Sequence, residues 1–117
     1  MGSPVVHFEV TGKDGKKLQE FYSTTFGWSI NADNPMSYGI VEAQEGVGIG
    51  GGISGGDGQR NQVTFYIAVD DPQAYLDRIE SAGGKTIVPV TEIPNMVTFA
   101  QFADPEGNIV GLVKEGM

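Results

Sequence analysis

The chain's one histidine lies two residues from a carboxylate, within a run that is typical of a strand. His7 and Glu9 alternate with Val6, Phe8 and Val10, and residues two apart in a strand point to the same face of the sheet. An imidazole beside a carboxylate can act as a general acid or base near neutral pH. His7 and Glu9 are therefore candidate catalytic residues.

An internal repeat brings further polar side chains to an equivalent face. The sequence shifted by 57 residues matches itself without a gap: Val6 falls on Val63, Phe8 on Phe65, Asp14 on Asp71, Gly27 on Gly84 and Ile30 on Ile87. Thr64 and Tyr66 are thus the repeat partners of His7 and Glu9. Tyr66 is a third candidate catalytic residue, because its hydroxyl can donate a hydrogen bond to a carbonyl or an oxyanion. His7, Thr64 and Tyr66 are also candidate ligand-binding residues.

A purely structural role is the alternative for each of these side chains. His7 would then be buried and hydrogen-bonded without a chemical role, as most buried polar groups are. Glu9 would pair with Arg60, Arg78 or a lysine, because an unpaired buried carboxylate is costly. Tyr66 would be ordinary strand packing.

The two halves of the repeat predict the same order of elements. Each begins with a strand rich in β-branched and aromatic residues, over 5–10 and 63–69. A helix follows, capped by Asp14 or Asp71 and ended by glycine. Three more strands complete each half, over 28–32, 38–42 and 47–53, and over 85–93, 96–103 and 108–114.

The sequence thus predicts an α+β fold with two βαβββ modules in a single domain, 1–117. The first module spans 4–54, a linker spans 55–61, and the second module spans 62–117. The glycine-rich stretch 46–58 lacks the Lys-Ser/Thr of a phosphate loop. We interpret its first part as a strand with little side-chain bulk.

Aromatic residues are divided between a possible binding surface and the core. Trp28, Phe99 and Gln101 are candidate ligand-binding residues, since aromatic side chains with a few polar groups suit a small, partly apolar ligand. Phe99 and Gln101 share one face of their strand, and Phe102 faces the other way. The structural alternative for the aromatic side chains is core packing, which is the prediction for Phe21, Tyr22 and Phe26.

Composition limits the partners. The 117-residue chain has a formal net charge of -8 and a pI of about 4.3, which repels phosphate backbones and argues against a nucleic-acid partner. An acidic cleft would favour a cationic ligand; the alternative is a solvated acidic surface. No apolar run is long enough to span a bilayer, no signal peptide is evident, and there are no cysteines. We expect a cytoplasmic protein without membrane contact.

Four stretches resemble the vicinal oxygen chelate superfamily, which includes glyoxalase I, extradiol dioxygenases and bleomycin-resistance proteins. They are His-Phe-Glu-Val at 7–10, Phe-Tyr-x-x-x-Phe-Gly-Trp at 21–28, Val-Asp-Asp-Pro at 69–72 and Asp-Pro-Glu-Gly-Asn at 104–108. The resemblance implies two βαβββ modules whose curved sheets enclose a cup, and a homodimer. It also implies, in metal-using members, one ligand on the first strand and one on the last strand of each module.

By that resemblance the metal site is degenerate. His7 matches the first ligand, but Thr64 and Gly111 take two further positions, and no carboxylate, His or Gln lies between Gly50 and Ser54. Threonine is a poor ligand for Zn²⁺, Ni²⁺ or Fe²⁺, and a catalytic site needs about three protein ligands. The sequence predicts no metal site and no cofactor.

Three functions remain open. The first is a metal-free protein that binds a cationic or aromatic small molecule, like the bleomycin-resistance branch. The second is a metal-independent isomerase or lyase that uses His7 and Glu9 as an acid–base pair, with Tyr66 polarising a carbonyl. The third is a metal-dependent glyoxalase-like enzyme or dioxygenase with ligands from unexpected places, such as Glu9 or Glu42, or from a partner chain.

Overall fold

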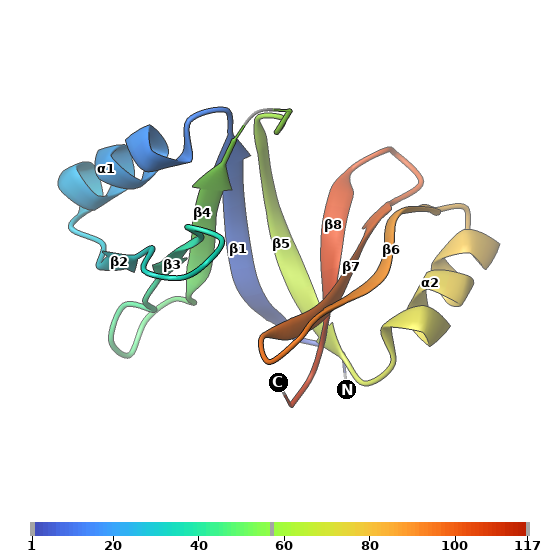
Figure 1. Ribbon diagram of the computed structural model, residues 1–117. Coiled ribbons are helices and arrows are strands. Elements are labelled where there is room, and N and C mark those ends of the chain that lie inside the picture. The colour runs from blue at the N-terminus through green and yellow to red at the C-terminus, as the bar shows by residue number, and fades with distance from the viewer. Residues whose placement is uncertain (1, 57, 117) are drawn as a thin grey trace. The chain divides into compact units, whose positions relative to one another are not determined.

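A computed structural model describes residues 2–56 and 58–116 (Figure 1). The first repeat forms β1 (Val5–Gly12), α1 (Gly15–Phe26), β2 (Ile30–Asn31), β3 (Gly39–Val41) and β4 (Gly51–Gly55). The second forms β5 (Gln62–Val69), α2 (Pro72–Ser81), β6 (Lys85–Ile93), β7 (Val97–Ala103) and β8 (Ile109–Lys114). The chain has two compact units: one holds residues 7–64, and the other holds 65–117 with the N-terminal residues as far as Val6.

The two repeats have the same strand topology. In the first unit the strand order is β2-β3-β4-β1, with β1 and β4 parallel and the other pairs antiparallel. In the second the order is β6-β7-β8-β5, with β5 and β8 parallel. The bounds of β1 and β5 also differ by the 57 residues of the repeat. The predicted α+β fold with two βαβββ modules is confirmed.

Both helices begin at the predicted aspartates. Asp14 accepts a hydrogen bond from the Lys17 amide at 3.0 Å, and Asp71 accepts one from the Ala74 amide at 3.2 Å. Each side chain thereby satisfies an amide that has no partner within its helix. Gly27 ends α1 in the left-handed conformation with φ 71°, which glycine adopts without steric cost.

The glycine-rich stretch differs from the prediction at both ends. Residues 47–50 do not join the sheet, because Gly46 and Gly48 have φ of 71° and 90° and the chain turns there. At the other end β4 continues to Gly55, which pairs with Gly12. A side chain at Gly55 would collide with the Gly12 carbonyl oxygen, so glycine permits this close approach of two backbones.

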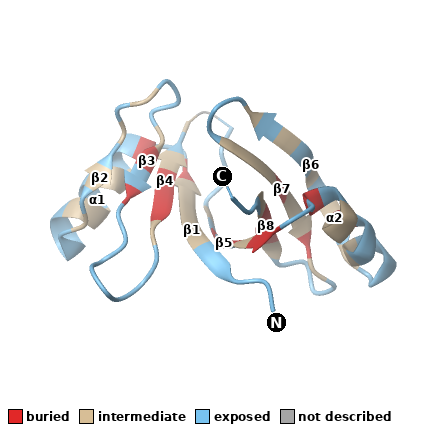
Figure 2. Ribbon diagram, turned by 90° about the horizontal axis from the view of Figure 1, so that it is seen from below, coloured by how far each residue is buried: buried red, intermediate tan, exposed pale blue. Residues whose placement is uncertain are grey.

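Each helix covers one face of its own module's sheet (Figures 1 and 2). Under α2 the buried cluster consists of Val69, Leu76, Ala100 and Leu112, with Phe102 packed against it as the strand alternation predicts. In the first unit, Val41 and Ile53 are buried. No helix among the described residues is long and apolar enough to cross a membrane.

Two predicted core residues are exposed instead. Phe21 and Phe26 retain 56% and 59% of their accessible surface, because α1 turns only part of its aromatic face toward the sheet. Tyr22 is half-buried and stacks on Trp28 with 5.4 Å between ring centroids. The prediction that Phe21 and Phe26 are core residues is therefore wrong.

Candidate functional site

His7, Tyr38 and Glu9 form a chain of two hydrogen bonds in the first unit. The His7 Nε2 atom lies 2.8 Å from the Tyr38 hydroxyl, and that hydroxyl donates to Glu9 Oε2 at 2.9 Å. The His7 and Tyr38 rings are nearly parallel, with 16° between their planes. Tyr38 thus bridges the two residues that the sequence predicts as an acid–base pair.

Strand β1 supplies two members of this chain, and a tight turn supplies the third. His7 and Glu9 share one face of β1, as predicted. The Asn34 Oδ1 atom accepts the Tyr38 amide at 3.0 Å, and the Asn34 Nδ2 atom donates to the Tyr38 carbonyl at 2.8 Å. Gln19 on α1 donates to the Ser37 carbonyl at 3.3 Å. Asn34 and Gln19 therefore fix the backbone from which Tyr38 reaches the sheet.

A glycine on β4 makes room for the Tyr38 ring. Gly52 is the register partner of Glu9 in the parallel β1–β4 pair, so its missing side chain belongs to the same face as Glu9. A Cβ built at Gly52 would overlap the Tyr38 hydroxyl and ring. The Tyr38 phenol therefore lies directly over Gly52.

The hydrogen-bond directions define the protonation state of His7. A tyrosine hydroxyl has one proton, and Tyr38 gives that proton to Glu9. The Tyr38 oxygen must then accept from His7 Nε2–H, which makes the neutral imidazole an Nε2–H tautomer. Burial lowers the pKa of His7 below its usual 6.5, because a low-dielectric surrounding disfavours the imidazolium. His7 is accordingly neutral at pH 7.

The second unit has a related arrangement built from different residues. The Gln101 Nε2 atom donates to the Tyr66 hydroxyl at 2.9 Å. Gly111 is the register partner of both Tyr66 and Gln101, and a Cβ there would overlap the Tyr66 ring. Tyr66 therefore crosses Gly111 to reach Gln101, and Phe99 shares their face by strand alternation. Each module thus has a tyrosine lying over a glycine of its last strand.

The predicted site residues fall into separate groups. His7 and Glu9 come together through Tyr38, and Tyr66 comes together with Gln101. Thr64 is buried on β5, two residues before Tyr66. Trp28 packs against Phe8, with 5.5 Å between ring centroids. Since Phe8 points to the helix-covered face of β1, Trp28 lies on the opposite face from His7, and its prediction as a ligand-binding residue beside His7 is wrong.

Comparison with known proteins identifies the family. The family model described as Glyoxalase/Bleomycin resistance protein/Dioxygenase superfamily matches residues 5–112. The chain belongs to this superfamily. A glyoxylase-like domain-containing protein of Didymella fabae is 31% identical over 111 residues, covering 86% of this chain and 84% of that protein.

Two further comparisons give a partial relative and a fold. The Mycobacterium tuberculosis protein named "Putative glyoxylase CFP32" is 29% identical over 107 residues, which are 85% of this chain but 41% of that protein. The chain thus spans less than half the length of this relative. The crystal structure of methylmalonyl-CoA epimerase from Mycobacterium tuberculosis superimposes with a TM-score of 0.67 at 15% identity, covering 97% and 88% of the two chains. That likeness supports the fold.

The residues present do not fit the metal site that the superfamily implies. Glu9 and Tyr66 are repeat partners, and their register partners are Gly52 and Gly111, so these two glycines hold equivalent last-strand positions. Neither has a side chain to donate. Within the described parts of the chain, no group of three or more His, Cys, Asp or Glu residues could hold a metal ion. His7 is the one first-strand or last-strand position with a good ligand type.

Tyr38 is the residue that sequence reasoning did not assign to the site. It lies outside the strands, just before β3, so strand alternation gave no face for it. The available signal was a combination of Asn34-Pro35, which favours a turn, and glycines on the facing strand, which leave space for a large ring. Only the register of β1 and β4 joins these two observations.

Proposed function

We propose that the chain binds a small organic molecule at the His7–Tyr38–Glu9 face of its first module, without a metal ion. The observation that carries this proposal is the 2.8 Å hydrogen bond between His7 Nε2 and the Tyr38 hydroxyl. A histidine binds a metal through a ring nitrogen lone pair, and here Nε2 carries a proton directed at Tyr38. Thr64, Gly52 and Gly111 offer no alternative ligand set.

The chemistry of the three side chains suggests the class of ligand. Glu9 carries a negative charge on a half-buried carboxylate, and a half-buried charge attracts a cation more strongly than an exposed one does. The Tyr38 ring and the exposed Ile40, which is the register partner of Gly52, add apolar surface nearby. A planar aromatic cation satisfies both features.

Titration calorimetry with proflavine, a planar aromatic cation, in the presence of EDTA tests this proposal. We expect saturable binding at one site per chain. Glu9→Gln keeps the shape and the hydrogen bond from Tyr38 but removes the charge, and should weaken binding roughly 5- to 10-fold. Glu92→Gln is the matched control, since Glu92 is exposed on β6. Equal affinity of Glu9→Gln and wild type, or no binding of any cationic aromatic compound, would contradict the proposal.

A second candidate function is metal-independent proton transfer next to a carbonyl, as in an isomerase or a lyase. The observation that favours it is the continuous path from neutral His7 through Tyr38 to Glu9. A base that is neutral at pH 7 and hydrogen-bonded to a carboxylate through a phenol can accept and return a proton. In this hypothesis Tyr66 would polarise the substrate carbonyl.

Deuterium exchange tests this second function. Small 2-oxo acids and acyl thioesters incubated with the protein in D₂O should exchange the hydrogen next to the carbonyl, as read by proton NMR. His7→Gln should abolish exchange above the buffer rate, while Glu92→Gln should not change it. Exchange that persists in His7→Gln would exclude His7 as the base.

A further inference from the structure

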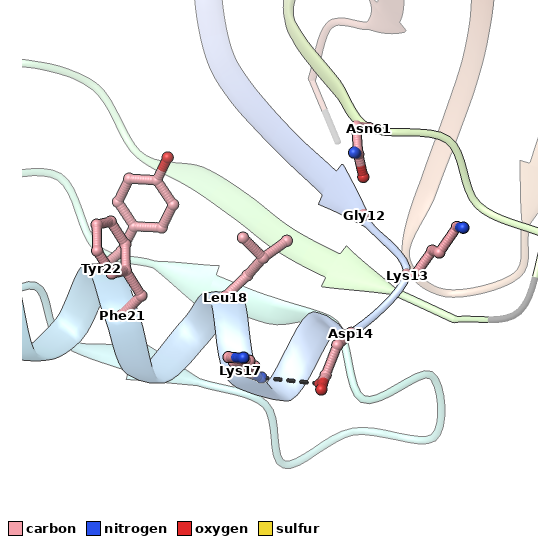
Figure 3. A pocket seen from close by; sticks show the side chains of 8 residues that line it. All are labelled: Gly12, Lys13, Asp14, Lys17, Leu18, Phe21, Tyr22 and Asn61. Carbon is pink, nitrogen blue, oxygen red and sulfur yellow. Dashed lines mark hydrogen bonds between the residues drawn. The ribbon is translucent and has the colours of Figure 1, made fainter.

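An open groove lies at the end of β1, apart from the His7–Tyr38–Glu9 chain (Figure 3). Its first part has a volume of about 430 Å³, and its second part about 350 Å³. The first part is lined by Gly12, Lys13, Asp14, Lys17, Leu18, Phe21, Tyr22 and Asn61. The second is lined by Val10, Thr11, Leu18, Asn61, Gln62 and Val63. Leu18 and Asn61 belong to both parts, which therefore adjoin.

The groove has an apolar wall that the fold leaves exposed. Phe21 is 56% exposed on α1, and Val63 is 74% exposed at the start of β5. Gly12 adds no side chain to the floor; a Cβ there would lie 3.0 Å from Leu18 and 3.2 Å from the Asn61 Oδ1 atom. Exposed apolar side chains that gather around one hollow are a feature of binding surfaces.

Cationic residues gather at the same place. The whole chain carries a net charge of -8, yet every Lys and Arg of residues 7–64 falls at 13, 16, 17 or 60. Lys13 and Lys17 line the groove, and the Thr11 hydroxyl donates to the Arg60 carbonyl at 3.0 Å, next to the lining Asn61. The one lining carboxylate is Asp14, whose Oδ1 atom is engaged by the Lys17 amide at the start of α1.

We propose that this groove binds a small amphipathic anion, namely an aromatic body that bears one acidic group. The aromatic body packs on Leu18, Phe21 and Tyr22, and the acidic group pairs with Lys13 and Lys17. Charge complementarity selects an anion here, because the lining lysines outnumber the single carboxylate. This ligand differs in sign from the one proposed for the Glu9 face, so the two proposals can fail separately.

The test uses two fluorescent probes that share an aromatic body and differ in charge. 8-Anilinonaphthalene-1-sulfonate carries a sulfonate, and N-phenyl-1-naphthylamine is its uncharged counterpart. We expect one saturable site per chain for the sulfonate. The double variant Lys13→Gln/Lys17→Gln should weaken sulfonate binding roughly 3- to 10-fold, the range for two exposed ion pairs. It should change the affinity for the uncharged probe less than about 2-fold.

Matched variants distinguish binding in the groove from a general effect of surface charge. Lys16→Gln removes the same charge from the same helix turn outside the groove and should leave sulfonate affinity within about 2-fold of wild type. Val63→Ser should weaken both probes, and Glu9→Gln should weaken neither. All these side chains except Glu9 are exposed or at the groove surface, and a cooperative thermal transition confirms that each variant is folded. Equal losses in Lys16→Gln and in the double variant, or no loss in the double variant, would overturn the proposal.

Discussion

Replacing Gly52 with alanine should break the His7–Tyr38–Glu9 chain without touching any of its members. The added methyl group would occupy the space of the Tyr38 hydroxyl and ring, so the ring must swing away from the sheet. Two hydrogen bonds are then lost, at 2.8 Å to His7 and at 2.9 Å to Glu9. The neighbouring backbone cannot relieve the overlap, because Gly52 is paired with both Glu9 and Ile40.

The size of the effect follows from those two bonds. A neutral hydrogen bond contributes about 0.5–1.5 kcal/mol and one to a charged group about 1.5–3 kcal/mol. Both are half-buried, and water can replace part of each, so we expect Gly52→Ala to destabilise the fold by about 1–3 kcal/mol. At about 4 °C per kcal/mol for a chain of this length, the melting temperature should fall by about 4–12 °C.

Urea unfolding and a double-mutant cycle with Tyr38→Phe provide the assay. If Gly52→Ala already removes the Tyr38 hydroxyl from its partners, Tyr38→Phe should cost little further stability in that background, although it is destabilising alone. Gly56→Ala is the control for the general effect of replacing glycine, since a Cβ there meets nothing within 4 Å. Fully additive effects, or a Gly52→Ala variant as stable as Gly56→Ala, would show that the methyl group does not displace Tyr38.

Three further predictions concern pH, helix capping and the core. Because folding lowers the pKa of His7, the unfolded chain binds more protons between that lowered pKa and 6.5. Wild-type stability should therefore rise with pH through this window, by at most about 1.4 kcal/mol per unit, relative to His7→Gln; a flat or falling difference in urea unfolding would contradict this. Asp71→Ala should cost about 1 kcal/mol through loss of the α2 cap, and Asp70→Ala close to nothing; equal costs in the same assay would exclude the cap. Leu76→Ala should cost about 2–5 kcal/mol, because Leu76 is 2% exposed, and a loss well below that range would mean that the α2 core is loosely packed.

The fold was predictable because its signals are local and occur twice. Asp14 and Asp71 each cap a helix 57 residues apart, and β1 and β5 keep the same spacing at both ends. Alternation within a strand correctly put His7 and Glu9 on one face, and Phe99 and Phe102 on opposite faces. These relations depend on neighbours in the sequence, and the repeat supplies an independent check on each.

The candidate site was only partly predictable, since its main contact depends on the pairing of distant strands. Tyr38 reaches His7 because Gly52 lies beside Glu9, and that register cannot be derived from either segment alone. Trp28 was assigned to the wrong face because it follows a helix, where alternation does not apply. Phe21 and Phe26 look like core residues by type, and their exposure depends on how far α1 extends past the sheet.

In the function that we propose, a phenol hydrogen-bonded to His7 replaces the metal ion of the superfamily's metal-using members. Elemental analysis of protein purified without chelators, by inductively coupled plasma mass spectrometry, tests this replacement most directly. We predict well under one divalent transition-metal ion per chain, with the same content in wild type and in His7→Gln. One ion per chain in wild type that disappears in His7→Gln would contradict it.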